Sequence, residues 1–299
     1  MIAVSGANGF VGRHLVARLR EAGAPVRALI SERPGAEREL PGGGEGLEVR
    51  RVDVRRGETL RGALDGCDAV VHTVAIPTER KQAFDAVNVR GVANVVAEAR
   101  RAGVGRLVHL SAIGADPASS FPYLKSKGQG QALVASSGIP FVVLRPSLLF
   151  GEGDDFFHRL AFSLAFPVVP VPGNGKARFQ PLHVLDLAAA LHAALVRRID
   201  EVAGVHEVGG PELITYDDLL AEAMRGTGKH RPTIHLPVPL MKPPALLMGL
   251  VMPDPPVTVP QLDLLAVDNT PRENAIERVF GVRPRPFRGA LDYLRRPRG

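Results

Sequence analysis

Cysteine, tryptophan and long apolar runs are scarce or missing in this chain of 299 residues, and each absence excludes a class of protein. The single cysteine, Cys67, rules out a disulfide framework and a cysteine metal cluster. We predict that it packs as a small apolar residue and that the chain works in a reducing cytoplasm. No apolar run reaches the ~20 residues that span a bilayer. The opening "MIAVSG" enters a strand pattern directly, so no signal peptide is expected.

Aromatic residues make up only 5% of the chain, and tryptophan is absent. Few surfaces are therefore available to stack bases, although the chain is basic, with a formal net charge of +6 and a pI near 9.9. The 31 arginines are dispersed over the expected helix faces, and only the tail "LRRPRG" forms a cluster. We predict no nucleic-acid partner. An anionic cofactor or an anionic lipid surface fits the positive charge.

Short apolar runs alternate with amphipathic segments through the first half of the chain. Expected strands cover residues 2–5, 25–30, 47–53, 69–75, 106–112 and 140–147, and expected helices cover 9–23, 83–103 and 123–138. Most of these strands are apolar on both faces, as strands buried in a parallel sheet are. The order predicts an α/β fold, a Rossmann-type doubly wound parallel sheet.

The alternation of strands and helices breaks after Ser147. We predict a dinucleotide-binding domain at 1–150, to which 181–210 returns, and a smaller C-terminal α+β region for a substrate or partner at 151–299. Within that region, residues 237–256 are rich in proline, leucine and methionine. They predict an exposed apolar surface that meets a partner protein or the surface of a membrane. The alternative is that these residues fold onto the core or wall a substrate pocket.

A glycine-rich turn lies between the first expected strand and the first expected helix. It reads "SGANGFVG", with Gly6, Gly9 and Gly12 spaced as G-x-x-G-x-x-G. Gly6 permits a tight turn, Gly9 lets the backbone approach a pyrophosphate, and Gly12 lets the helix lie close to the sheet. The helix N-terminus then offers N–H groups to the phosphates. This spacing at this position predicts a dinucleotide-binding loop.

The second expected strand indicates which dinucleotide binds. An acidic residue at its end would favour NAD, but Ile30 and Ser31 occupy that place, with Glu32 just beyond. Arg13 and Arg33 suit a 2′-phosphate, so we favour NADP(H) over NAD(H). The alternative is that Glu32 and Arg33 are solvated loop charges.

Two further polar features stand in this half of the chain. Asp53 either bonds the adenine amine or caps the next helix. "YLKSK" places Tyr123 and Lys127 four residues apart on one helical face. Three tyrosines and six lysines in 299 residues give a chance match of about 6%, so this motif alone is weak.

Taken in order, the motifs resemble those of a known family. The glycine loop, Asn88 in "VNVRGVANV", "HLSAIGA" and "YLKSK" are followed by "RPSLLFG", "PGNGKARFQPLHVLDLAAAL" and "EVGGPELITYDDLL". Over nearly its whole length the chain resembles the extended short-chain dehydrogenases/reductases, which are NAD-dependent epimerase/dehydratase-like. The pattern is most similar to an atypical branch, the one containing the nucleotide-binding accessory subunit of respiratory complex I and its bacterial relatives.

The resemblance implies roles for individual residues. Tyr123 would be the acid/base, Lys127 would bind the nicotinamide ribose and lower the pKa of the tyrosine, and Asn88 would support a proton relay or make a plain helix contact. Arg145 and Pro146 would border the nicotinamide pocket. The full set of expected cofactor contacts is Gly6, Asn8, Gly9, Phe10, Val11, Gly12, Arg13, Ser31, Arg33, Asp53, Val54, Val74, Ala75, Lys127, Arg145 and Pro146.

Two departures from the family pattern concern the catalytic hydroxyl. The stretch "LSA" provides Ser111, but the register could place Ala112 at the catalytic position, and Tyr123 follows Ser111 by only twelve positions. We therefore hold two hypotheses. One is an oxidoreductase that transfers hydride to or from an unknown carbonyl or alcohol. The other is a non-catalytic NADPH-binding scaffold.

The histidines and acidic residues receive structural interpretations. We predict that His72 and His109 are hydrogen-bonded core imidazoles and that His183 is a structural residue before a helix. No spacing of His, Asp and Glu predicts a metal site.

Overall fold

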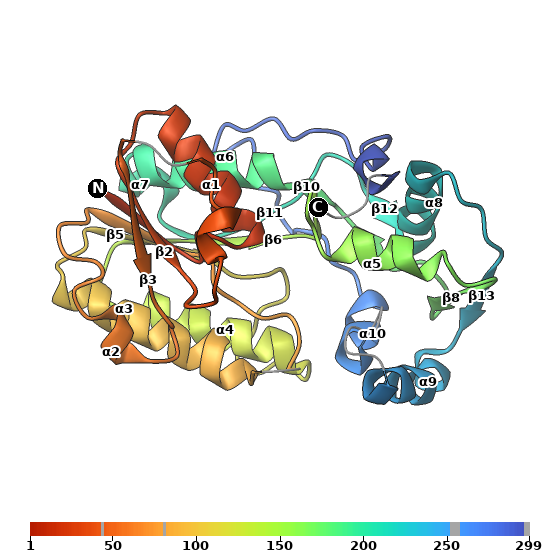
Figure 1. Ribbon diagram of the computed structural model, residues 1–299. Coiled ribbons are helices and arrows are strands. Elements are labelled where there is room, and N and C mark those ends of the chain that lie inside the picture. Colours follow the sequence, from red (N-terminus) through yellow and green to blue (C-terminus); the bar gives the residue numbers. More distant parts are fainter. Residues whose placement is uncertain (43–44, 80–81, 252–257, 296–299) are drawn as a thin grey trace. The chain divides into compact units, whose positions relative to one another are not determined.

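The structure is a computed structural model that describes residues 1–42, 45–79, 82–251 and 258–295, without side chains for 249–251 (Figure 1). The chain forms two compact units. Unit 1 holds Met1–Pro146, Val184–Val208 and Glu273–Arg283, and unit 2 holds Ser147–His183, Gly209–Arg272 and Pro284–Gly299.

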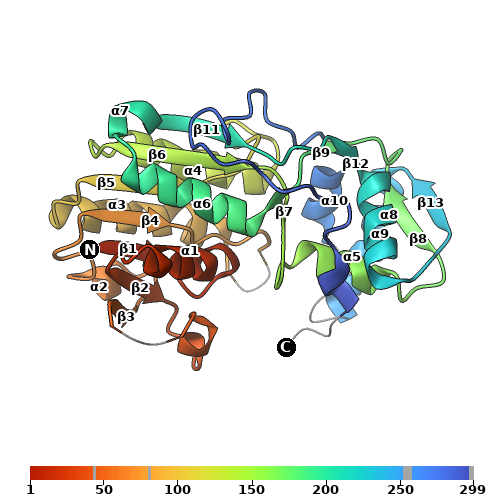
Figure 2. The same cartoon turned by 90° about the horizontal axis from the view of Figure 1, so that it is seen from above.

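A seven-stranded parallel sheet forms the centre of unit 1 (Figure 2). Its strand order is β11-β6-β5-β4-β1-β2-β3. The strands are β1 (Ile2–Ser5), β2 (Val26–Ile30), β3 (Leu47–Arg51), β4 (Ala69–His72), β5 (Arg106–Leu110), β6 (Phe141–Pro146) and β11 (Gly204–Val208). The chain runs outward in one direction from β1 to β3 and in the other from β4 to β11, so the order reverses between β1 and β4. This doubly wound sheet confirms the predicted fold class.

Helices cover both faces of this sheet (Figure 1). On one face lie α1 (Phe10–Glu21), α6 (Val184–Val196) and α7 (Ile199–Val202), and on the other lie α2 (Gly57–Leu60), α3 (Gly91–Arg101) and α4 (Pro122–Ala135). Helix α1 turns its stripe of Val11, Leu15 and Leu19 inward, where all three are buried. The 3.6-residue periodicity that predicted this helix therefore also gives its buried face.

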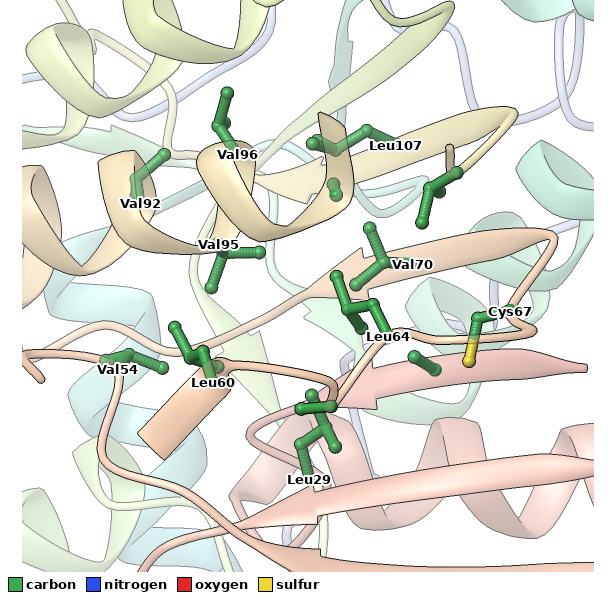
Figure 3. Packing of buried hydrophobic residues seen from close by; sticks show 14 of the residues in the cluster. Leu29, Val54, Leu60, Leu64, Cys67, Val70, Val92, Val95, Val96 and Leu107 are labelled. Atoms are coloured by element: carbon green, nitrogen blue, oxygen red, sulfur yellow. The ribbon is translucent and has the colours of Figure 1, made fainter. Parts of the chain in front are cut away.

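The core between the sheet and α2 and α3 is almost entirely aliphatic (Figure 3). Cys67 is buried in this cluster, and burial raises the pKa of its thiol. The Arg27 guanidinium lies 3.3 Å from the Cys67 sulfur and also donates to the Asp65 carbonyl at 2.6 Å. Cys67 is thus a packing residue, as predicted.

Unit 2 combines short strand pairs with helices. Parallel pairs join β7 (Leu149–Phe150) to β10 (Leu182–His183) and β8 (Val169–Pro172) to β13 (Thr233–Leu236). An antiparallel pair joins β9 (Arg178–Phe179) to β12 (Ile214–Thr215). The helices are α5 (Phe156–Ser163), α8 (Tyr216–Thr227), α9 (Val238–Val251), α10 (Val259–Leu265) and the 3-10 helix η3 (Asp292–Arg295). At its core Phe150 packs edge-to-face against both Phe157 and Phe287, and the Phe157 and Phe287 rings are tilted against each other.

The division of the chain differs in one respect from the boundaries drawn on the sequence. Residues 1–150 and the returning segment 181–210 approximate two pieces of unit 1, but Glu273–Arg283 also belongs to unit 1 instead of the C-terminal region. Its Ala275 amide donates to the Glu207 carbonyl at 2.9 Å, next to the edge strand β11. This segment has no strand periodicity of its own, so the sequence pattern did not reveal its return.

Helix α9 covers most of the described part of segment 237–256, and 252–257 lies outside the described residues. Met241 and Ala245 are buried against Leu262 of α10. Leu240, Leu246 and Leu247 instead have 61–64% of their surface exposed. The described helix therefore has one face packed within unit 2 and one apolar face open to solvent. Over the residues that the structure covers, no helix is both long and apolar enough to cross a membrane.

Candidate nucleotide-binding site

The glycine loop joins β1 to α1 through a backbone that only glycine allows. Gly6 has a φ of +83°, in the left-handed region. The Gly9 amide donates to the Gly6 carbonyl at 2.9 Å and closes the turn. A Cβ atom on Gly12 would lie 2.0 Å from the Gly6 oxygen, so the first turn of α1 touches the loop directly. This arrangement points the helix N-terminus toward the space above the loop.

A cavity of about 520 Å³ opens beside this loop at the carboxyl ends of β1, β2, β3 and β4. This is where the strand order reverses, the usual ligand position in a doubly wound sheet. Its lining residues are Gly6, Asn8, Gly9, Phe10, Val11, Leu29, Ile30, Ser31, Glu32, Arg33, Val52, Asp53, Val54, Arg55, Thr73, Val74, Ala75, Gln82 and Val87. Eleven of the sixteen expected contacts therefore line one cavity. The glycine loop, the helix N-terminus and the lining at the ends of four parallel strands fit a dinucleotide.

The other five expected contacts lie elsewhere. Gly12 is behind the loop, and the Arg13 guanidinium lies 5.7 Å from the centre of the Phe10 ring. Arg145 and Pro146 are the last two residues of β6. The Arg145 side chain donates to the Gln131 side chain at 2.8 Å and to the Ala115 carbonyl at 2.9 Å. The fifth, Lys127, belongs to α4.

Polar contacts bind the glycine loop to the end of β2. Asn8 accepts from the Ser31 amide at 3.2 Å and donates to Glu39 at 2.9 Å. Glu39 closes the short 3-10 helix η1 (Ala36–Glu39) and is ion-paired with Arg33. The residues expected at the 2′-corner of an adenosine ribose, Ser31 and Arg33, are thus joined through Asn8 and Glu39.

Two more ion pairs lie at the end of β3. Arg55 donates from its side chain to both carboxylate oxygens of Asp53, and these bonds hold the pKa of Asp53 below its usual value. Arg56 is ion-paired with Glu32 across from the end of β2. Helix α2 begins after Arg56 without a side-chain cap, so the proposal that Asp53 caps this helix is wrong. Its adenine contact stays a prediction.

Lys127 and Tyr123 come from the first two turns of α4. Lys127 is only 3% exposed, and its ammonium donates to the Leu110 carbonyl at 2.7 Å, where β5 ends. Burial lowers the pKa of Lys127 to about 8. The half-buried Tyr123 ring lies 5.9 Å from that of Phe84, and burial raises the pKa of Tyr123 to about 12. This direction is opposite to the one that acid/base work at neutral pH requires.

Asn88 ties the cavity wall to α4. It lies in the π-helix η2 (Asp85–Arg90), an irregularity that often accompanies functional sites. Its amide group accepts from the Ile76 backbone N–H at 2.9 Å and donates to the Ile76 carbonyl at 3.1 Å and the Ser126 hydroxyl at 3.0 Å. The residue therefore holds the chain just beyond Val74 and Ala75, and these bonds go to the Ile76 backbone and the Ser126 hydroxyl, which are structural partners.

The hydroxyl of Ser111 points into the interior. Its Oγ atom is buried and has no hydrogen-bond partner among the described residues, whereas Ala112 is half-buried. The side chain of Ser111 is thus buried, and the placement of Ala112 at the catalytic position stays a prediction.

His72 and His109 occupy paired positions on β4 and β5, with nearly parallel rings 5.6 Å apart. His72 Nδ1 lies 3.1 Å from the Ser5 hydroxyl. Neither ring nitrogen of His109 has a partner in the described part of the chain, so the prediction of a hydrogen-bonded imidazole is wrong for His109. Burial, with the nearby Lys127 ammonium, lowers the pKa of both imidazoles and keeps them neutral.

The remaining expectations concern His183 and metals. The His183 ring packs edge-on against Phe150 with centroids 4.9 Å apart, in agreement with a structural role. Within the described ranges, no group of three or more His, Cys, Asp or Glu side chains could hold a metal ion.

Sequence reasoning missed Glu39, Arg55 and Arg56 around the cavity. Arg55 and Arg56 come two and three positions after Asp53, and two basic residues just beyond the third expected strand were a signal that could have found them. Glu39 ends the 3-10 helix η1, eight positions after Ser31, and no spacing rule points to it.

Comparisons with known proteins agree with the cavity. Residues 6–156, just over half of the chain, match the sequence model of a family described as NAD(P)H-binding. The chain is 30% identical over 247 residues to the ceramide reductase of Caulobacter vibrioides, covering 80% of this chain and 74% of that protein. It is 26% identical over 288 residues to mitochondrial NADH dehydrogenase (ubiquinone) 1 alpha subcomplex subunit 9 of Arabidopsis thaliana, covering 92% and 71% respectively.

A solved structure shows the same fold. UDP-glucose 4-epimerase of Thermus thermophilus, in complex with NAD, aligns with a TM-score of 0.73 and 21% identity over 98% of this chain and 97% of that one. The matched residues 6–156 include every residue that lines the cavity. The chain therefore belongs to this NAD(P)H-binding family, whose relatives include complex I accessory subunits and bacterial reductases, as its motifs predicted.

Proposed function

We propose that the protein is an oxidoreductase that binds NADP(H) and acts on a carbonyl or alcohol. One observation carries the proposal: the dinucleotide cavity and the Tyr123–Lys127 pair belong to the same unit, and Asn88 links them. The likeness to a ceramide reductase supports this reaction class. The bound nucleotide supplies the hydride.

The chain supplies the proton transfer. Tyr123 would give a proton to the reacting oxygen or take one from it. Lys127, which donates to the Leu110 carbonyl, would place its positive charge near the Tyr123 hydroxyl. Burial raises the pKa of Tyr123 to about 12, so the tyrosine needs a nearby cation to react at neutral pH. We infer that the ammonium of Lys127 provides this charge once substrate and nucleotide are bound.

Two substitutions test this proton transfer. Tyr123→Phe should keep NADPH affinity and abolish NADPH-dependent carbonyl reduction. Lys127→Met should weaken nucleotide binding as well, whereas the matched control Lys125→Met, an exposed lysine on the same helix, should change neither. Tyr216→Phe, in unit 2, controls for loss of a buried tyrosine hydroxyl. Full reductase activity in Tyr123→Phe would refute the role of Tyr123.

We infer a preference for NADPH over NADH from the residues at the end of β2. No carboxylate stands at Ile30 or Ser31, and Arg33 lines the cavity. A charge-assisted bond to a 2′-phosphate contributes about 1.5–3 kcal/mol, which corresponds to at least a tenfold preference. Calorimetric titration with both nucleotides measures it. Arg33→Ala should remove most of the preference, and Arg13→Ala, outside the lining, should remove less. Equal affinities in the parent would contradict the inference.

A second candidate function is an NADPH-holding scaffold without turnover. Two observations favour it: the Ser111 hydroxyl is buried without a hydrogen-bond partner among the described residues, and burial raises the pKa of Tyr123. The complex I accessory subunits among the relatives are compatible with it. Loss of a stabilising hydroxyl typically slows catalysis by roughly 10²–10³, so a slow enzyme and a scaffold differ in degree. Nucleotide that copurifies without being added, together with no reduction of a carbonyl panel, would favour the scaffold.

We further propose that the exposed face of α9 contacts the surface of an anionic membrane, from a cytoplasmic location. Leu240, Leu246 and Leu247 offer apolar area without hydrogen-bonding groups. The formal net charge of +6 favours an anionic surface. The alternative occupant is an apolar protein partner.

A further inference from the structure

The adenosine side of the cavity carries balanced charge. Three arginines stand there, and each is ion-paired with a carboxylate: Arg33 with Glu39, Arg55 with Asp53, and Arg56 with Glu32. Arg33, one of the two arginines that favour a 2′-phosphate in the sequence, is therefore already paired with a carboxylate in the folded chain. A doubly charged phosphate that enters this corner must share these guanidinium groups with the carboxylates or displace them.

Among these carboxylates, Glu39 has the central place. It lies at the end of η1, and its carboxylate accepts hydrogen bonds from the side chains of two cavity residues, Arg33 and Asn8. Asn8 in turn accepts from the Ser31 amide. Glu39 itself does not line the cavity. It therefore approaches Arg33 and Asn8 from outside, while their other sides face the space that a nucleotide would fill.

We propose that Glu39 is a specificity-determining residue: its carboxylate competes with the 2′-phosphate of NADP(H) for Arg33 and so limits the preference for the phosphorylated nucleotide. This inference rests on the proposed nucleotide function. Binding of NADP(H) moves Arg33 from an internal carboxylate to the phosphate of the ligand, so part of the new interaction only replaces an old one. NADH has no 2′-phosphate and leaves the Arg33–Glu39 pair in place.

The substitution Glu39→Gln separates charge from position. The amide oxygen of glutamine still accepts hydrogen bonds from Asn8 and Arg33, so both side chains keep an anchor. The negative charge is lost, so the Coulombic attraction between residue 39 and the Arg33 guanidinium disappears, and Arg33 is held less tightly against residue 39. We expect NADPH affinity to rise about three- to tenfold, or about 0.7–1.4 kcal/mol at RT ln of that ratio, while NADH affinity stays nearly constant.

A matched control lies on the same short helix. Glu37 accepts from Arg51 at 2.7 Å and, like Glu39, is not among the lining residues. Glu37→Gln changes the net charge by the same amount, two positions away. A general electrostatic effect would therefore appear in both variants, and competition for Arg33 would appear only in Glu39→Gln.

The experiment measures dissociation constants of NADPH and NADH by calorimetry for the parent, Glu39→Gln and Glu37→Gln, with melting curves to verify folding. The ratio of NADPH to NADH affinity should rise only in Glu39→Gln. Adding Glu39→Gln to Arg33→Gln should leave the ratio of NADPH to NADH affinity unchanged, because the arginine for which the carboxylate and the 2′-phosphate compete is gone. An unchanged or lower ratio in Glu39→Gln, or an equal rise in Glu37→Gln, overturns the proposal.

The outcome is separable from that of the proposed function. A parent that binds both nucleotides equally, but gains a preference in Glu39→Gln, refutes the NADPH preference and supports the competition. A parent that binds neither nucleotide refutes the proposed function and this inference together.

Discussion

Replacing Gly12 by alanine tests the contact between α1 and the glycine loop. In an ordinary helix position, glycine to alanine stabilises by up to about 1 kcal/mol because alanine is the better helix former. At Gly12 the new Cβ would lie 2.0 Å from the Gly6 oxygen, 2.8 Å from the Gly6 carbonyl carbon and 2.9 Å from the Ala7 Cα. All three are backbone atoms, so no rotamer change relieves the overlap.

The size of the effect follows from this geometry. Cβ atoms essentially never approach other heavy atoms closer than 3.0 Å, so helix and loop must separate by about 1 Å. Overpacking of this kind costs about 1–3 kcal/mol, and the rigid backbone places Gly12→Ala at the upper end. After the gain in helix propensity, we expect a net loss of about 2 kcal/mol. For domains of this size that lowers the melting temperature by roughly 4–8 °C.

Gly9→Ala provides the comparison. The backbone of Gly9 is extended, with φ −79° and ψ 173°, and its Cβ would lie 3.2 Å from the Gly6 oxygen. Alanine should therefore fit there with a small stability change, yet it adds a methyl group to the cavity lining. Thermal melting and NADPH titration should show that Gly9→Ala loses binding alone and Gly12→Ala loses both. A Gly12→Ala variant as stable as the parent, with unchanged NADPH affinity, would refute the close-approach argument.

Three further predictions follow from buried or exposed side chains. Lys127→Met should raise the free energy of unfolding more at pH 7 than at pH 10, by up to about 3 kcal/mol. Burial lowers the pKa of this lysine from 10.5 to about 8. The buried ammonium therefore reduces the free energy of unfolding by its full amount below pH 8, and this reduction disappears as the pH rises toward 10.5. Equal gains in the free energy of unfolding at both pH values, measured by denaturant titration, would contradict this. Asn88→Ala should cost about 1–3 kcal/mol and weaken NADPH binding, because the Ile76 backbone loses its partner; unchanged melting and titration curves would exclude it. Leu240→Ser with Leu247→Ser should abolish flotation with anionic liposomes, and a parent that never floats at low salt refutes the membrane contact.

The fold and the cavity were predictable because local patterns carry them. The apolar runs that predicted the strands are buried on both faces in β1, β2 and β4. Gly6 and Gly12 are required by backbone geometry, which any chain with this turn must satisfy. Residues at strand ends, such as Ser31, Asp53 and Ala75, meet at one edge because parallel strands end there.

Pairings between distant residues were not predictable in the same way. The sequence contains Arg33 as a basic residue near the right strand, but its partner Glu39 depends on how η1 turns. Likewise, the periodicity places His109 inside a strand, and only packing decides that its ring nitrogens have no partner among the described residues. The direction of the Tyr123 pKa shift also depends on burial, which a four-residue motif does not encode.

The three-segment composition of unit 1 has a consequence for synthesis on the ribosome. All lining residues of the cavity lie before residue 90, but the edge strand β11 begins only at Gly204. Until then β6, the apolar "FVVLRP", is an open edge of the sheet. At a synthesis rate of roughly 5–20 residues per second, its backbone groups on that edge stay unpaired for several seconds. A nascent chain at this stage would hold a complete nucleotide cavity and a strand ready to pair with another molecule. Early nucleotide binding and chaperone protection of β6 would therefore favour correct folding in the cell.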